Sequence, residues 1–170
     1  MDSQVNLRRI RTDEGGAYRE VRLRALQRAP DAYEITYEES IQISGDEWRS
    51  LAEQGAEAME CAIFVLDRGD GVFGGTVFVR VNEQPPYDAF VGAMWVDEDL
   101  RGSSVASALL DAAEHFASVC GSTMCELWVE ADNIPGRRLY EGHGYAETGV
   151  TMPGRRDVRS LLMQKQLLRR

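Results

Sequence analysis

The segment Phe90–Leu110 combines residue types that can bind an anion. A strand-like apolar run ends at Val96, acidic residues follow at 97–99, and small residues after Arg101 lead into an amphipathic helix. The first amides of a helix have no partner within the helix, and small side chains let a ligand approach the backbone. Such a turn suits phosphate groups, and Arg101 adds a fixed positive charge. We therefore predict a phosphate-binding turn here, with simple close packing as the alternative.

A second segment, Leu127–Tyr145, reads as a strand, a polar turn, a short helix and a glycine stop. Asn133 stands where its side chain can cap the helix, or equally offer its amide to a ligand. Tyr140 follows seven residues later, near the helix end. From its position alone, Tyr140 is interpreted as a core aromatic residue.

Apolar periodicity predicts the elements that must position these two segments. We expect strands at 5–10, 61–66, 72–81, 88–96, 124–129, 145–148 and 158–167, and helices at 14–29, 47–59, 103–120 and 134–141, with a further short helix within 31–45. Asp13 is the expected N-cap of the first helix. This order predicts an α/β chain with a mixed sheet and one parallel crossover. We expect a single domain over residues 1–170.

Taken together, the two segments resemble the signatures of the GNAT acetyltransferase superfamily. Arg101–Ala106 is similar to R/Q-x-x-G-x-G/A, and Asn133–Tyr145 is similar to N-x-x-A-x-x-L-Y-x-x-x-G-F/Y. The resemblance covers about residues 60–148. It implies an acyl-CoA N-acyltransferase fold, in which a mostly antiparallel central sheet is splayed between two parallel strands and flanked by about four helices.

The resemblance also implies an activity, which is acetyl transfer from acetyl-CoA to a primary amine by direct attack in a ternary complex. The pantetheine arm would lie between the strands at 88–96 and 124–129. An N–H near Val96 would stabilise the oxyanion, a contribution of about 3 kcal/mol in other acyl transfers. Tyr140 would be the catalytic acid that protonates the CoA thiolate. The implied cofactor-binding residues are Met94, Trp95, Val96, Arg101, Gly102, Ser103, Ser104, Val105, Ala106 and Asn133.

Two residues depart from the family pattern. Ser104 stands where the pattern has glycine, and we expect ordinary helical dihedrals that keep its amide as a donor. Gly136 replaces an alanine, at a cost of about 1 kcal/mol within a helix and without an expected effect on the chemistry. Ser104 favours the alternative function, a non-catalytic acyl-CoA-binding sensor or partner subunit. A different donor, such as succinyl-CoA, is a third interpretation.

The general base and the acceptor are not fixed by the sequence. Glu130 ends its strand, where it could take a proton directly or through water, or face bulk solvent. The loop at 30–40 contains two tyrosines and several acids, which suit a cationic acceptor or a solvated helix. The acceptor could be a small-molecule amine or a protein amine. The arginines of the first helix are interpreted as solvation and local pairing; they are Arg19, Arg22, Arg24 and Arg28.

Composition excludes several other classes of function. The net charge of −9 argues against nucleic-acid binding. Three cysteines form no disulfide framework, and the spacing of Cys120 and Cys125 from either histidine matches no zinc pattern, so no metal is expected. The chain shows no secretory signal and no apolar run of about 18 residues that could span a membrane. We expect a cytoplasmic protein; a homodimer is compatible with the resemblance, but the sequence does not select it.

Overall fold

The computed structural model of the chain describes residues 6–69, 71–84 and 88–168. The strands are β1 (Asn6–Arg9), β2 (Cys61–Asp67), β3 (Phe73–Val81), β4 (Ala89–Val96), β5 (Met124–Glu130), β6 (Ala146–Pro153) and β7 (Arg159–Gln166). The α-helices are α1 (Gly15–Arg28), α2 (Tyr37–Ser40), α3 (Gly45–Glu57), α4 (Val105–Val119) and α5 (Ile134–Gly142), and short 3-10 turns occupy Glu98–Leu100 and Arg155–Asp157. None of the helices in these ranges has the length and hydropathy that a membrane span needs.

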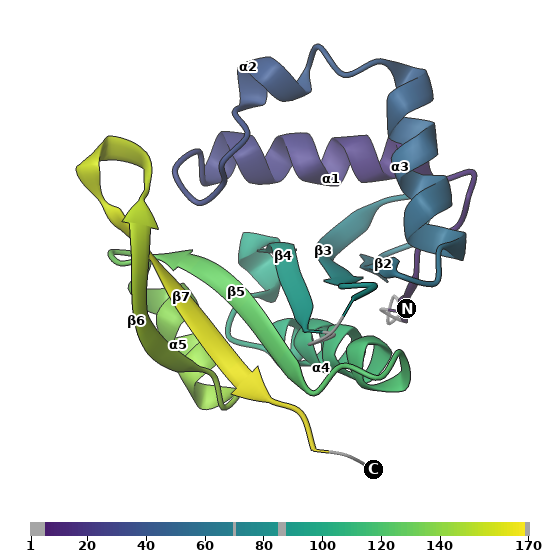
Figure 1. Cartoon of the computed structure of the whole chain (residues 1–170). Coiled ribbons are helices and arrows are strands. Elements are labelled where there is room, and N and C mark those ends of the chain that lie inside the picture. The colour runs from purple at the N-terminus through teal and green to yellow at the C-terminus, as the bar shows by residue number, and fades with distance from the viewer. Residues whose placement is uncertain (1–5, 70, 85–87, 169–170) are drawn as a thin grey trace.

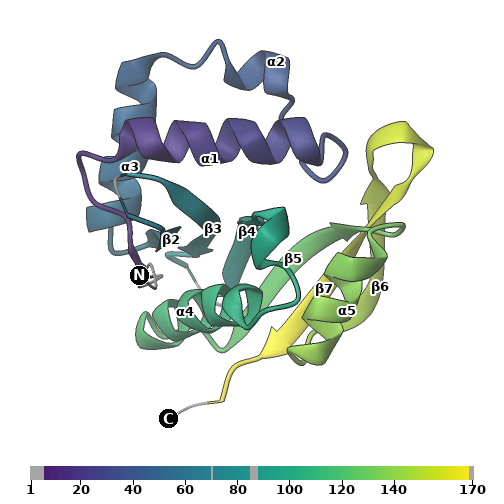
Figure 2. The same cartoon turned by 180° about the vertical axis from the view of Figure 1, so that it is seen from behind.

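The strands form one mixed sheet in the order β1-β2-β3-β4-β5-β7-β6. Every neighbouring pair is antiparallel except β4 and β5, which run parallel and are joined through α4. The α1 and α3 helices pack on one side of the sheet, and α4 and α5 lie on the other (Figures 1 and 2). This is the mixed α/β fold predicted from the sequence.

The sheet opens between β4 and β5. Only two residue pairs join these strands, Ala89 with Cys125 and Phe90 with Glu126. On its other edge, β4 stays paired with β3 as far as Val96, although the register shifts across a bulge. Within that bulge Ala93 has a positive φ of 51°. A bulge bends its strand and increases the local twist, so β4 diverges from β5 beyond Phe90, within the gap that the resemblance implied.

Two apolar clusters hold this arrangement, one on each face of the sheet. Strand β5 shows why the faces differ, because its side chains alternate in burial along the strand. Leu127 and Val129 are buried in the cluster beneath α4, whereas Trp128 and Glu130 belong to the opposite face. The alternation therefore directs the Glu130 carboxylate, at the end of β5, toward the face of the sheet that α1 covers, where the gap opens.

The first residues of α1 and α4 differ from those predicted. Asp13 was wrongly expected to cap α1, since Glu14 occupies that position without a capping bond. The Glu14 carboxylate is instead held by Arg8 at 2.5 Å. The α2 and α3 helices each begin with a complete capping box. In contrast, α4 begins at Val105, two residues later than expected, and has no side-chain cap.

Candidate active site

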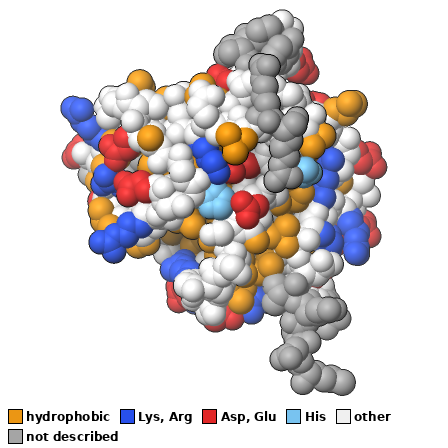
Figure 3. All heavy atoms as spheres, turned by 90° about the horizontal axis from the view of Figure 1, so that it is seen from below, with side chains coloured by type: hydrophobic (Ala, Val, Ile, Leu, Met, Phe, Trp, Pro, Cys, Tyr) orange, Lys and Arg blue, Asp and Glu red, His pale blue; other side chains and the backbone are white. Residues whose placement is uncertain are grey.

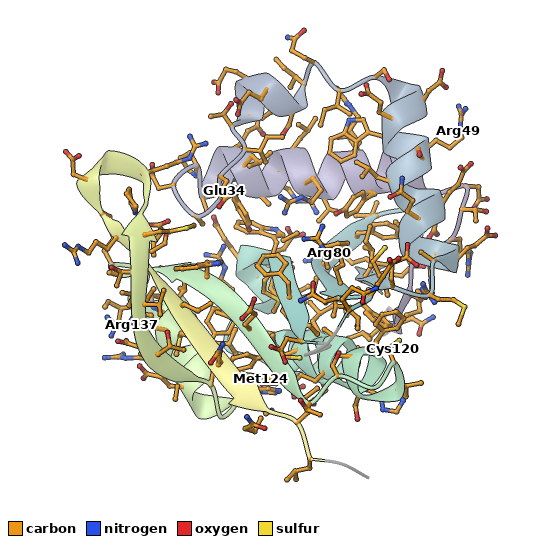
Figure 4. The ribbon with its side chains drawn as sticks, viewed as in Figure 1. Glu34, Arg49, Arg80, Cys120, Met124 and Arg137 are labelled. Atoms are coloured by element: carbon orange, nitrogen blue, oxygen red, sulfur yellow. The ribbon has the colours of Figure 1, made fainter. Side chains whose placement is uncertain are left out.

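A cleft of about 580 Å³ lies where β4 and β5 separate. Its walls come from the strand edges, from the α1–α2 loop and from the β6–β7 hairpin. The loop and the hairpin meet, because the Arg155 guanidinium donates to the Glu34 carbonyl. Glu34 lies on the α1–α2 loop, beside the hairpin (Figure 4). Segments more than 100 residues apart in the chain therefore bound one cleft.

Two side chains from the α1 region contact the β4 bulge. The Tyr33 hydroxyl donates to the Met94 carbonyl at 2.7 Å, and the Arg22 guanidinium lies 3.5 Å from the Ala93 carbonyl. These contacts hold the bulged backbone in place. Met94 and its two successors, which the resemblance assigned to pantetheine, therefore lie on a strand edge that β5 does not pair.

Trp95 and Arg101 fix the end of β4. The Trp95 indole is buried and donates to Asp97 at 2.9 Å. The Arg101 guanidinium donates to the Val96 carbonyl at 3.1 Å and stacks over the Trp95 ring, 4.8 Å from its centroid. Although Arg101 is exposed, these contacts hold its positive charge beside the turn, where it was predicted.

The turn after β4 has an exposed, uncapped helix start. Gly102 has a φ of 75°, in the left-handed region that favours glycine. Ser104 has a φ of −74°, as expected, so serine in place of the family glycine adds no backbone strain. The Ser103 hydroxyl accepts the Val105 amide at 3.3 Å, which engages one of the predicted phosphate donors. The amide of Ala106 belongs to the first turn, where an α-helix supplies no partner.

Two of the three acidic residues before this turn are neutralised locally. Asp97 pairs with Arg24 at 2.9 Å, and Asp99 pairs with Arg68 at 2.6 Å. The hydrogen bond from Arg68 lowers the pKa of Asp99 below its ordinary value. Because the carboxylates are paired, they oppose an incoming phosphate less than free acids would.

Asn133 caps α5, as the sequence allowed. Its Oδ1 accepts the Gly136 amide at 3.1 Å. A methyl group on Gly136 would lie 2.6 Å from the Asn133 Nδ2 atom. The glycine that replaces the family alanine therefore leaves room for the Asn133 side chain in this position. The side-chain NH₂ of Asn133 remains available to a ligand.

Tyr140 lies on α5 and packs against the larger core cluster. Its ring meets Tyr145 edge-on, with 6.0 Å between centroids, and its hydroxyl makes no hydrogen bond to the described residues. Burial raises the pKa of Tyr140 above its ordinary value, and the nearby Tyr33 contributes. The phenol therefore stays protonated at neutral pH and can act as a proton donor.

Glu130 is the side chain whose direction the sequence left open. It lines the cleft, and its Oε1 accepts the Ser160 hydroxyl at 2.6 Å. Its Oε2 is buried without a partner among the described residues. Gly154 packs against this carboxyl, and any methyl group there would collide with it. Glu130 is therefore a carboxylate in the cleft wall without a cationic partner among the described residues, a group that can act as a general base.

The end of α5 carries a histidine that contacts α4. The His143 side chain lies 3.1 Å from the Asp111 carboxylate. Figure 3 shows histidine side chains among acidic and basic ones on this face. Asp111, Glu114 and His143 could together hold an ion, yet the Lys165 ammonium already pairs with Glu114 at 2.6 Å, and its charge opposes a second cation.

Arg22 is a cleft residue that its sequence context did not reveal. It was interpreted as a solvated surface residue, but only 8% of it is exposed, and it lines the cleft. The sequence did contain a signal for its burial. Arg22 lies four residues after Tyr18 and three before Ala25, so it shares the face of α1 that these two residues bury. Of the acidic loop at 30–40, Tyr33 and Glu34 reach the cleft, whereas Glu39 closes a capping box.

A mixed sheet that opens beside a bulged strand, with an uncapped helix start at the end of that strand, defines an acyl-CoA-dependent transferase fold. The chain belongs to the acetyltransferase (GNAT) family, whose model matches residues 24–145. It is accordingly an acyltransferase, as the sequence predicted.

Individual relatives agree with this assignment. The uncharacterised N-acetyltransferase YycN of Bacillus subtilis (strain 168) is 28% identical over 111 residues, which span 65% of this chain and 71% of that protein. A GNAT acetyltransferase from Streptococcus pneumoniae has a TM-score of 0.83 at 15% identity, covering 97% of this chain and 100% of that one. The PaiA N-acetyltransferase of Thermoplasma acidophilum, in complex with coenzyme A, has a TM-score of 0.73 at 16% identity, covering 96% and 99%. At these identities, the two structures show a shared fold.

Proposed function

We propose that the protein transfers the acetyl group of acetyl-CoA to a primary amine, by direct attack in a ternary complex. One observation carries this proposal: β4 has no β5 partner beyond Phe90, it borders the cleft at Phe90–Ala93, and the chain after β4 leads to the uncapped start of α4. The strand edge offers main-chain hydrogen bonds along its length, and the helix start offers amides to a diphosphate.

The residues on the donor side fit acetyl-CoA. The backbone of Met94, Trp95 and Val96 binds the pantetheine arm in place of a missing strand neighbour, and the NH₂ group of Asn133 adds a contact. Around the turn, the pyrophosphate is held by main-chain amides and by the charge of Arg101. The residues proposed for this turn are Gly102, Ser103, Ser104, Val105 and Ala106; the Val105 amide must first leave the Ser103 hydroxyl.

When bound, acetyl-CoA supplies an acetyl thioester, which an uncharged amine can attack. Glu130 takes one proton from the bound ammonium, which leaves the uncharged amine, and the second proton passes to water after the C–N bond forms. The amide near Val96 stabilises the negative charge on the acetyl oxygen. Tyr140 donates its proton to the sulfur as the C–S bond breaks, consistent with a phenol that burial keeps protonated.

The cysteines support direct transfer over a covalent acetyl-enzyme. A thiol must be ionised to attack, but burial raises the pKa of Cys125 to about 12. Burial also raises the pKa values of Cys61 and Cys120. The feature that favoured a non-catalytic acyl-CoA sensor was Ser104, and its helical dihedrals remove that support.

Two measurements test the proposal together. Calorimetry with acetyl-CoA and with succinyl-CoA measures donor binding, and a thiol-release assay measures turnover across amines, peptides and amino acids. We expect micromolar acetyl-CoA binding and thiol release that depends on an amine. Binding without release above background for every amine would contradict catalysis and leave a sensor, whereas no binding of either donor would refute the whole assignment.

A further inference from the structure

Arg22 places a buried positive charge at the cleft. The residue lies in the middle of α1, is 8% exposed and lines the cleft wall. Its guanidinium stacks on the Tyr33 ring, 4.8 Å from the centroid, and reaches the Ala93 carbonyl at 3.5 Å. The aromatic ring and the strand backbone therefore hold the guanidinium in one position.

No carboxylate of the described residues forms an ion pair with Arg22. Arg9 is partly buried without one too, but three main-chain carbonyls accept hydrogen bonds from it. Arg8 pairs with Glu14 and Asp67, and Arg24 pairs with Asp97. Burying a cation without a counter-charge is costly, and such charges in proteins are normally paired. Because the guanidinium lies at a cleft wall, a ligand can supply the missing negative charge.

The cleft also contains a carboxyl group that no cation neutralises. Glu130 has one buried oxygen without a partner and forms no ion pair within the part of the chain that the structure describes. A cation and a carboxyl group that line one cleft without pairing are complementary to a molecule that carries an anion and an amine. The cleft lining also includes apolar and aromatic side chains, which are Phe78, Phe90, Trp128 and Met152. A second arginine of the lining, Arg155, donates to the Glu34 carbonyl.

We propose that Arg22 binds the carboxylate of the acceptor, and that the acceptors are free α-amino acids with apolar or aromatic side chains. This inference rests on the proposed function, because the amine must reach the acetyl group. A protein lysine carries no carboxylate beside its amine, and the first residue of a peptide has an amide in that place. Both are therefore poor acceptors for this cleft.

Matched acceptor pairs test the inference. Thiol release is measured for leucine, methionine and phenylalanine, and for the amide of each, with acetyl-CoA saturating. We expect kcat/KM for each amino acid to exceed that for its amide by about 100-fold, as for a desolvated charge pair. The amide group lowers the pKa of the amine, which works against this preference and cannot cause it. Equal constants for acids and amides would overturn the proposal.

Variants separate recognition from a structural role. In Arg22→Gln the acid-to-amide ratio should fall to about 1, whereas loss of structure alone would lower both constants and leave the ratio unchanged. Arg22→Lys should retain part of the preference, because it keeps the charge but loses the planar fork. Arg28→Gln is the matched control, since it removes the same charge from an exposed position of the same helix, and it should keep the wild-type ratio.

Other outcomes separate this inference from the proposed function. Turnover of amines that carry no anion, with none for amino acids, would refute the role of Arg22 and leave acetyl transfer standing. If no amine is acetylated, calorimetry of the CoA-saturated wild-type protein with leucine and with leucinamide decides the matter. Binding of leucine alone would support the anion site without catalysis, and binding of neither or of both equally would overturn it.

Discussion

The Glu130→Gln substitution tests the proposed base with the least change in shape. Glutamine keeps an oxygen that can accept the Ser160 hydroxyl, which lies 2.6 Å from Oε1, so we expect the fold to be retained. What the variant loses is a proton acceptor inside the cleft. It must therefore take up amine that has already lost its proton in solution.

The size of the effect follows from the acceptor. An amine with a pKa near 10 is about 0.1% uncharged at pH 7, and a positioned base contributes about 10²–10⁴-fold. We expect kcat/KM of Glu130→Gln to be about 100- to 1,000-fold below wild type at pH 7. The deficit should shrink by about tenfold per pH unit toward the pKa of the amine, because the uncharged fraction rises at that rate.

The measurement is a thiol-release assay from pH 6.5 to 9.5, with acetyl-CoA affinity followed by calorimetry. Glu126→Gln is the control, because Glu126 shares the strand and the face with Glu130 but does not line the cleft. Gly154→Ala provides a second route, since a methyl group there takes the space of the Glu130 carboxyl and should reproduce much of the deficit. A Glu130→Gln enzyme with the wild-type rate and the wild-type pH profile would refute the role of Glu130.

Three further predictions follow from other parts of the site. Tyr140→Phe should lower kcat by about 100-fold or more, with little change in acetyl-CoA affinity. Because burial raises the pKa of Tyr140, the phenol stays protonated at every pH below its ordinary pKa of about 10. The wild-type kcat should therefore show no alkaline fall from this group up to that pH. Unchanged turnover would remove Tyr140 as the acid. Gly102 has a φ of 75°, so Gly102→Ala should lower the free energy of unfolding by about 1–2 kcal/mol and weaken CoA binding in calorimetry. The control Gly16→Ala, on an open helix face, should stabilise the protein by up to about 1 kcal/mol and bind CoA normally. Equal CoA affinities of the two variants would argue against a strained turn at the phosphates. Asp97→Ala removes the acceptor of a buried indole N–H and one acceptor each of Arg24 and Arg68. Thermal denaturation should therefore show a loss of about 2 kcal/mol, and an unchanged melting temperature would mean that solvent replaces these bonds.

The sequence by itself determined the features that depend on neighbours within a few positions. The turn after Arg101, which we propose binds phosphate, follows from small residues between a strand and a helix, and the α5 cap follows from Asn133 standing before Ile134. The order of the elements was predicted because apolar periodicity is a local property of each element. The ends of the elements were predicted less accurately. Asp13 was expected to cap α1, but Glu14 occupies the N-cap position, and its carboxylate pairs with Arg8 instead of capping the helix.

The tertiary structure decided what meets in the cleft. Arg22 lies 71 positions from the Ala93 carbonyl that it contacts, and Glu130 lies 30 positions from Ser160. No spacing in the sequence encodes such distances, because they depend on how far β4 diverges from β5 and where the β6–β7 hairpin reaches the α1–α2 loop. A charged residue on a helix or a strand end is compatible with solvent or with a binding site, and only the packing of distant segments around it determines which of the two it faces.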